Sequence, residues 1–371
     1  MNPFRWLKSF FALDWVIGVV PILLTCLGLV LIYALGLAQN RMGLFWGQLE
    51  YAGMGLVLFV IALSIDYRSL RQASPYLYVI TVLLLVAVMI FGQKTLGATR
   101  WINLGFFQLQ PAELMKAFVI FVVANLLADQ IGQITWRKYI TVLILSALPI
   151  VLVLIEPDLG TTIVIAGIVA SMLVASRLSA RQIGASFLIV VACLGLGWVS
   201  LKSYQRTRIE VFLNHKNSSS DSKNSSYNVR QSIIAVGSGG LMGQGIGRGS
   251  QSELNFLPVA DTDFMFATAA EATGLLGTLI LLGLYALLIW RIWHLTVATN
   301  DPFAMLVAVG VGSMLLIQVI VNVGMNIGLL PVTGIPLPFV SHGGSSLIVT
   351  MFLMGVLESM YLRRKKLQFH S

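Results

Sequence analysis

Charged residues are scarce in this chain of 371 residues, since lysine, arginine, aspartate and glutamate together make up only 11% of it. Soluble domains carry about 25%, so the composition excludes a protein that faces water over most of its surface. Hydrophobic residues make up 57%, which favours a chain that has lipid as its solvent. Cysteine is also rare, and because Cys26 and Cys193 both lie in apolar runs, a structural disulfide is not expected.

The signatures of several soluble function classes are missing as well. The Gly-rich stretch 237–245 lacks the Lys-Ser/Thr ending of a nucleotide-binding loop, and no cluster with metal-ligand spacing is present. The net charge of +9 comes without a basic run beside stacking aromatic residues, so no nucleic-acid partner is expected. Basic residues in a membrane protein usually mark its cytoplasmic loops instead.

Long apolar runs dominate the sequence, and each can cross a bilayer, which takes about 17–25 residues. The ten runs lie at 15–37, 44–65, 76–92, 112–128, 139–155, 160–176, 183–201, 264–290, 303–330 and 345–362. They predict an all-α integral membrane protein of about ten transmembrane helices, with residues 1–371 as a single membrane domain. The first run is too long for the core of a signal peptide and is interpreted as an uncleaved span.

The distribution of basic residues predicts the orientation of these helices. With a cytoplasmic N-terminus, the short outside loops hold only Arg41, Lys94 and Arg100. The inside segments then hold thirteen basic residues: Arg5, Lys8, Arg68, Arg71, Arg137, Lys138, Arg177, Arg181, Arg291, Arg363, Arg364, Lys365 and Lys366. Because lysine and arginine in short segments favour the cytoplasmic side, both termini are predicted to be cytoplasmic.

One long extracytoplasmic loop, 202–262, is predicted between the seventh and eighth helices. Its residues 214–228 are rich in serine and asparagine and almost devoid of apolar side chains, which is typical of a flexible insertion. The rest of the loop is Gly-rich but carries leucine, isoleucine and phenylalanine, so it is expected to be ordered and close to the membrane. Its glycines would let backbone N–H groups approach an anion.

Ionisable side chains near the outer span ends are candidates for function, because charges are costly near hydrocarbon. Glu113 and Lys116 share one helix face, and they either neutralise each other or line an outward cavity where Lys116 meets a phosphate. Asp158 either caps the helix that follows it or also pairs with Lys116. Asp263 either caps the eighth helix or is a functional group whose pKa nearby Asp261 raises.

The last outer loop, 332–346, reads VTGIPLPFVSHGGSS and combines hydroxyls with flexible backbone. Ser341 and Ser345 offer hydroxyl groups, while Gly343 and Gly344 allow positive φ. The loop is either a re-entrant packing segment or part of a binding site.

Five segments in order resemble the SEDS family (shape, elongation, division, sporulation), and its RodA branch more than its FtsW branch. They are RWINLGFFQLQPAELMK, EPDLGT, QSIIAVGSGGLMGQGIGRGSQSELNFLP, TDFMFATAAEATGLLG and NVGMNIGLLPVTGIPLPFVSHGGSS. The resemblance implies a ten-span fold in the cytoplasmic (inner) membrane. It also implies a peptidoglycan glycosyltransferase that faces the periplasm or cell exterior and serves cell elongation and cell-shape maintenance.

The same resemblance implies that lipid II is polymerised into an undecaprenyl-linked glycan strand within membrane lipid, with a class B penicillin-binding protein as partner. The family's essential aspartate falls on Asp263, its charged pair on Glu113 and Lys116, and its turn aspartate on Asp158. The chain departs from the family at Val259–Asp261, which stand where Glu, any residue, and His are common.

The implied mechanism has Asp263 as general base on the GlcNAc 4-hydroxyl of lipid II. Lys116, with Arg100 or Arg248, would counter the charge of the leaving lipid pyrophosphate. The other predicted substrate-binding residues are Glu113, Asp158, Ser341, Gly343, Gly344 and Ser345. Mg²⁺ or Mn²⁺ on the pyrophosphate is compatible with this chemistry, although no dedicated ligand set is visible.

Two other functions stay open at this point. A lipid II flippase would use the same charges as a translocation path, and a non-catalytic scaffold would only hold a penicillin-binding protein. No inverted repeat of the kind common in transporters is visible, and the acidic cluster lies at one membrane face, which favours the enzyme. Gly274, Gly277 and Gly283 in the eighth run either serve helix packing or give lipid tails access.

Overall fold

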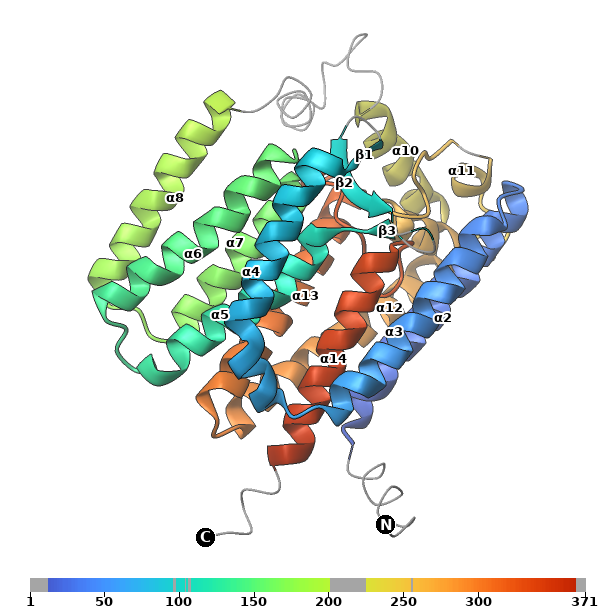
Figure 1. The fold of residues 1–371 in the computed structure, drawn as a ribbon. Helices are drawn as coiled ribbons and strands as arrows, with labels where there is room; N and C mark the ends of the chain where they lie inside the picture. Colours follow the sequence, from blue (N-terminus) through green and yellow to red (C-terminus); the bar gives the residue numbers. More distant parts are fainter. Residues whose placement is uncertain are drawn as a thin grey trace, which may run out of the picture.

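The chain forms a bundle of long apolar helices that runs between two differently built ends (Figure 1). The computed structural model describes residues 13–95, 98–103, 105, 108–200, 225–254 and 256–364. The helices of the bundle are α2 (Trp15–Ala38), α3 (Gly43–Ser64), α4 (Tyr67–Phe91), α5 (Pro111–Leu127), α6 (Trp136–Ile155), α7 (Leu159–Ala175), α8 (Ala180–Ser200), α12 (Met265–Ala298), α13 (Pro302–Asn326) and α14 (Gly344–Arg364).

Each of the ten predicted apolar runs falls on one of these helices. Eight helices among the described residues are long and apolar enough to cross a membrane, while Leu159–Ala175 and Ala180–Ala192 are shorter apolar helices. The structure thus confirms a helical multi-spanning membrane protein, with eight candidate spans and two shorter apolar helices among the described residues. The predicted insertion at 214–228 lies outside the described residues except for 225–228, which begin α10 (Ser225–Ser238).

The two ends of the bundle differ in what they carry (Figure 1). One, here called the terminal end, holds the start of α2 and the end of α14. There Arg291 pairs with Asp14, and Glu358 accepts a hydrogen bond from the Asp14 backbone, which ties α12, α2 and α14 together. The opposite end, the loop end, carries a small sheet, the α6–α7 turn, and the segments 225–264 and 327–343.

The small sheet at the loop end was not predicted from the sequence. It is antiparallel, in the order β1 (Gln93–Thr95), β2 (Ala98–Asn103) and β3 (Gln108–Leu109). Lys94 pairs with Thr99, and Ile102 pairs with Leu109. The sheet connects α4 to α5 and places β2 across the loop end of the bundle (Figure 1).

Helices α5 and α13 form the centre of the bundle, where α5 contacts α4, α6, α7, α13 and α14. Side chains of α5 such as Met115, Ile120 and Phe121 are fully buried. By contrast, α8 stands at the edge of the bundle (Figure 1), and its described side chains are largely exposed. Helix α5, which carries Glu113 and Lys116, is thus among the most buried helices of the bundle.

Helix α12 runs further than the predicted span 264–290 and breaks at Gly274, which has φ 67° and ψ −166°. A Gly-rich segment, 239–249, fills the break. Backbone N–H groups of Gln244 and Gly245 donate to carbonyls of α12 at 2.9 and 3.0 Å, and Leu275 N–H donates to the Gly240 carbonyl at 2.9 Å. This exchange satisfies backbone groups that would otherwise be orphaned in an apolar setting.

The glycines of this segment are needed for close approach rather than for binding an anion. A Cβ on Gly239 would stand 2.1 Å from the Ala270 carbonyl, and one on Gly243 would stand 2.3 Å from the Ala272 carbonyl. The prediction that these backbone N–H groups would receive an anion is therefore wrong for Gly243, Gln244 and Gly245, because each already donates to a backbone carbonyl.

Replacing Gly274 by alanine should destabilise the folded protein. Its φ of 67° suits only glycine there, and a Cβ would stand 2.3 Å from Gly243 N. Backbone strain of this kind costs on the order of 1–3 kcal/mol, and the overlap adds to it. Thermal unfolding in detergent measures the loss.

Gly283→Ala is the matched control in the same helix, because a Cβ at Gly283 would meet nothing within 4 Å. Alanine is favoured over glycine in a helix by roughly 0.5–1 kcal/mol, so this variant should be as stable as the wild type or slightly more stable. An equal loss of stability in both variants would contradict the role given to Gly274.

Candidate active site

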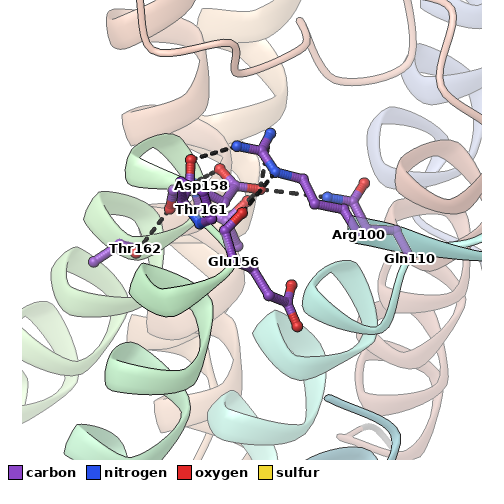
Figure 2. Close-up of polar contacts among 7 residues, drawn as sticks. Arg100, Gln110, Glu156, Asp158, Thr161 and Thr162 are labelled. Carbon is purple, nitrogen blue, oxygen red and sulfur yellow. Dashed lines mark hydrogen bonds and ion pairs between the residues drawn. The ribbon is translucent and has the colours of Figure 1, made fainter. Parts of the chain in front are cut away.

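Asp158 organises the turn between α6 and α7 (Figure 2). Its Oδ1 accepts from Thr161 N at 3.1 Å, and its Oδ2 accepts from Thr161 Oγ1 at 3.0 Å. These bonds satisfy a donor that the helix start leaves without a partner. The prediction that Asp158 caps the following helix is therefore confirmed.

Arg100 comes to the same turn from strand β2 (Figure 2). Its Nη1 lies 3.9 Å from Asp158 Oδ2, its Nε donates to the Glu156 carbonyl at 3.0 Å, and its Nη2 donates to the Pro157 carbonyl. The predicted pairing of Asp158 with Lys116 is therefore wrong. The small sheet, which sequence reasoning missed, folds Arg100 over the turn instead.

Gln110 links three helix starts at this place. It precedes α5, its Nε2 donates to Asp158 Oδ2 at 3.4 Å, and its backbone N–H donates to Ser345 Oγ at 3.0 Å. Ser345 in turn donates to the Gln108 carbonyl at 2.8 Å. The starts of α5, α7 and α14 are thus joined by side-chain hydrogen bonds, and Ser345 is buried as part of that junction.

Glu113 and Lys116 lie one turn inside α5, as their spacing predicted. Lys116 Nζ stands 2.6 Å from Glu113 Oε2, and the two side chains are only 3% and 4% exposed. This is the geometry of a mutually neutralised pair. A buried pair contributes little net stability but is costly to break, since removal of one partner leaves an uncompensated charge.

Asp263 lies in the loop directly before α12, whose N-cap is Phe264. Two adjacent residues of the last loop hold it. Ser341 Oγ donates to the Thr262 carbonyl at 2.6 Å, and His342 N donates to the Asp261 carbonyl at 2.7 Å. The predicted site loops around Asp263 and Ser341 are therefore adjacent in the structure.

A short stretch of the last loop, Thr333–Ile335, lies between the Asp158 turn and Asp263. Asp263 Oδ2 is 3.5 Å from the point where a Cβ on Gly334 would stand, and Gly334 has φ 77°. On the other side, a Cβ on Gly160 would come within 3.0 Å of both Ile335 Cγ1 and the Thr333 carbonyl. The two predicted aspartates thus share a neighbour in this stretch.

His342 is charged less readily than an ordinary histidine. Burial lowers the pKa of its imidazole, nearby Arg41 lowers it too, and the carboxylate of Asp261 opposes both effects by raising it. Asp261 thus acts on His342. The predicted effect of Asp261 on Asp263 stays a prediction.

Gly343 and Gly344 do not adopt the positive φ that the sequence allowed, whereas Gly334 does. Gly344 is instead needed for space, because a Cβ there would stand 2.6 Å from the Tyr51 ring.

Arg248 is exposed on the Gly-rich segment, and among the described residues it forms no ion pair within 4.0 Å. Its role as a substrate-binding residue stays a prediction.

Sequence reasoning missed several buried amide side chains that hold the loops. Gln48 on α3 accepts from Gly343 N at 3.2 Å and donates to the Ser341 carbonyl at 3.3 Å. Asn322 and Asn326 on α13 are fully buried and bond the Asp263 carbonyl. The signal that could have found them is a lone amide within an apolar run, which is costly in a membrane unless it is hydrogen-bonded.

Glu156 precedes Asp158 by two residues, but its side chain points away from the Arg100 guanidinium (Figure 2). It is 2% exposed, and neither carboxyl oxygen has a hydrogen-bond partner among the described residues. Burial, followed by the charge of Asp158, raises the pKa of Glu156 to about 8, although Arg100 opposes the shift. Glu156 therefore holds a proton at neutral pH.

This raised pKa predicts a pH-dependent stability. The folded protein binds the Glu156 proton more tightly than the unfolded chain, whose glutamate titrates at its ordinary pKa of 4.5. The stabilisation is complete below that value and is lost as the pH rises toward about 8. As the pH rises between these two values, the unfolding temperature of Glu156→Gln in detergent should therefore fall less than that of the wild type. A wild-type slope in Glu156→Gln would contradict the assignment.

Comparison with known proteins extends these observations. The chain is 40% identical over 352 residues to the peptidoglycan glycosyltransferase MrdB of Escherichia coli (strain K12), with 94% of each chain covered. It is 34% identical over 355 residues to stage V sporulation protein E of Bacillus subtilis (strain 168), with 93% of this chain and 95% of that protein covered.

Two solved structures share the fold. A chain from a peptidoglycan synthase complex matches with a TM-score of 0.79 at 30% identity, over 95% of this chain and 98% of that chain. The rod shape determining protein RodA of Thermus thermophilus matches with a TM-score of 0.72 at 28% identity, over 95% and 97%. A family model described as cell cycle protein, for FtsW, RodA and SpoVE, covers residues 13–366. The chain therefore belongs to this FtsW, RodA and SpoVE family, the SEDS family.

Proposed function

We propose that this protein is a peptidoglycan glycosyltransferase that polymerises lipid II into glycan strands during cell elongation. The observation that carries the proposal is the match over 94% of the chain to a protein named for this activity. The loop end supports it, because it carries a carboxylate and two cationic groups: Asp263 before α12, Lys116 in the second turn of α5, and Arg100 on β2 beside the start of α7.

Asp263 is the proposed general base. It would take the proton of the GlcNAc 4-hydroxyl of lipid II as that oxygen attacks the anomeric carbon of the growing strand. The bond to the lipid pyrophosphate breaks, and the α-linked donor becomes a β-linked product. The placement of Asp263 beside Gly334 supports this role, since glycine leaves room next to the carboxylate.

The leaving pyrophosphate needs positive charge near it as it departs. Arg100 is a candidate because its side chain is 29% exposed while its guanidinium is held by the turn at Asp158. Lys116 is buried against Glu113 and would act from within the bundle. Mg²⁺ or Mn²⁺ would arrive with the pyrophosphate in this proposal, since no group of three or more metal-ligating side chains occurs among the described residues.

The proposal places the loop end outside the cytoplasmic membrane, where lipid II is polymerised. The excess of arginine and lysine in segments of the terminal end supports this orientation. A class B penicillin-binding protein is the proposed partner, because a chain similar to this one was solved within a peptidoglycan synthase complex.

Asp263→Asn should lower the rate of lipid II polymerisation by about 10²–10⁴-fold, which is the usual contribution of general base catalysis. The assay uses the purified protein with its penicillin-binding protein and counts glycan product on gels. Asp301→Asn is the matched control, since Asp301 caps α13 at the opposite end of the bundle and asparagine caps a helix equally well. A wild-type rate in Asp263→Asn would remove Asp263 from the role of base.

Two further measurements separate the rival functions, which are a flippase and a scaffold. A flippase would move lipid II between the leaflets of vesicles without forming polymer, even as the wild type with its partner. A scaffold would keep cell shape in a strain that carries Asp263→Ala. Either result would overturn the proposed enzyme.

A further inference from the structure

Two asparagines on α13 reach across to the loop that carries Asp263. Asn322 and Asn326 lie one helical turn apart, and both are 0% exposed. Asn322 Nδ2 donates to the Asp263 carbonyl at 3.0 Å, and Asn326 Nδ2 donates to the same oxygen at 3.1 Å. Both lone pairs of one backbone carbonyl are thus used by side chains from another helix.

Asn322 also fixes the opposite wall of the site. Its Nδ2 donates to the Ile335 carbonyl at 2.7 Å, so its two amide hydrogens serve two different loops. One loop carries Asp263, and the other carries Gly334, which faces the Asp263 carboxylate. This amide therefore helps to set the distance between the carboxylate and that wall, together with the bonds that Ser341 and His342 donate to the loop before α12.

The side-chain oxygen of Asn326 accepts hydrogen bonds as well. Its Oδ1 accepts from Ala267 N at 3.1 Å and from Ser232 Oγ at 3.2 Å. Ala267 lies in the first turn of α12, where backbone N–H groups have no partner within the helix, and the N-cap residue Phe264 makes no side-chain cap bond. Asn326 thus caps α12 from a neighbouring helix, directly after Asp263.

We propose that Asn322 is a positioning residue that sets the Asp263 carboxylate against the Gly334 wall, with Asn326 holding the same carbonyl. The inference rests on the proposed function of Asp263. Clamping the carbonyl fixes the peptide plane that follows Asp263 and restricts where its side chain can point. If the two asparagines only filled space in the core, their amides would not need to converge on this one oxygen, and Asn322 would not need to bond the facing loop as well.

Asn322→Ala should lower kcat for lipid II polymerisation by about 10–100-fold, because a displacement near 1 Å can cost about 10²-fold. KM for lipid II should change by less than about threefold, since the amide contacts backbone rather than substrate. Rates are divided by the folded fraction, measured by thermal unfolding in the same detergent.

Gln318→Met is the matched control. Gln318 lies one turn before Asn322 on the same helix and is equally buried, but its amide has no hydrogen-bond partner among the described residues. It should keep wild-type kcat and KM. If Asn322→Ala does not fold, Asn322→Gln keeps the amide donors one methylene further out and should fold with a reduced kcat.

Several outcomes would overturn the inference. The first is a wild-type kcat in folded Asn322→Ala, or in Asn322→Gln if the alanine variant does not fold. The second is a loss of kcat in Gln318→Met as large as that in Asn322→Ala. In the Asp263→Asn background, Asn322→Ala should add no further loss, because residues that act as a unit are not additive; a full additional loss would show that Asn322 acts elsewhere. Failure of the proposed function itself would look different, since the wild type would form no polymer or Asp263→Asn would keep its rate.

Discussion

The loop end of this protein depends on one constraint: backbone groups that lie outside helices and strands still need hydrogen-bond partners where water is scarce. At the break in α12, the Gly-rich segment supplies them, and Gly239 and Gly243 permit the contact. Around the site, side chains supply them instead. Gln48 and Asn322 reach from α3 and α13 to loop backbone groups, so the helices determine where the loops lie.

The same constraint explains why polar chemistry can sit at the end of an apolar bundle. Two buried charges have partners close by: Lys116 pairs with Glu113 three residues away, and Asp158 is bonded by Thr161 and lies near Arg100. Glu156 has no such partner among the described residues, and burial shifts it to the neutral form. Which groups carry charge at the loop end is thus decided by packing.

Much of the fold could be predicted from the sequence, because apolar runs of membrane length leave few alternatives. The Glu113–Lys116 pair and the Asp158 cap follow from local spacing and are present. The pairing of Asp158 with Arg100 could not be predicted, since it depends on a short sheet with no strong strand pattern. The role of Asn322 was not predicted, since its amide bonds the Asp263 and Ile335 carbonyls of loops that local spacing does not connect to α13.

The two predicted site aspartates of the loop end are held in different ways. The carboxylate of Asp158 is engaged by Thr161 of α7, by Gln110 before α5 and by Arg100 of β2. At Asp263, the bonds from Asn322 and Asn326 go to the main-chain oxygen. The loop at Asp263 is thus anchored through its main chain, so α13 sets the position of residue 263, whereas the Asp158 turn is anchored through a side chain and would loosen if that side chain were replaced.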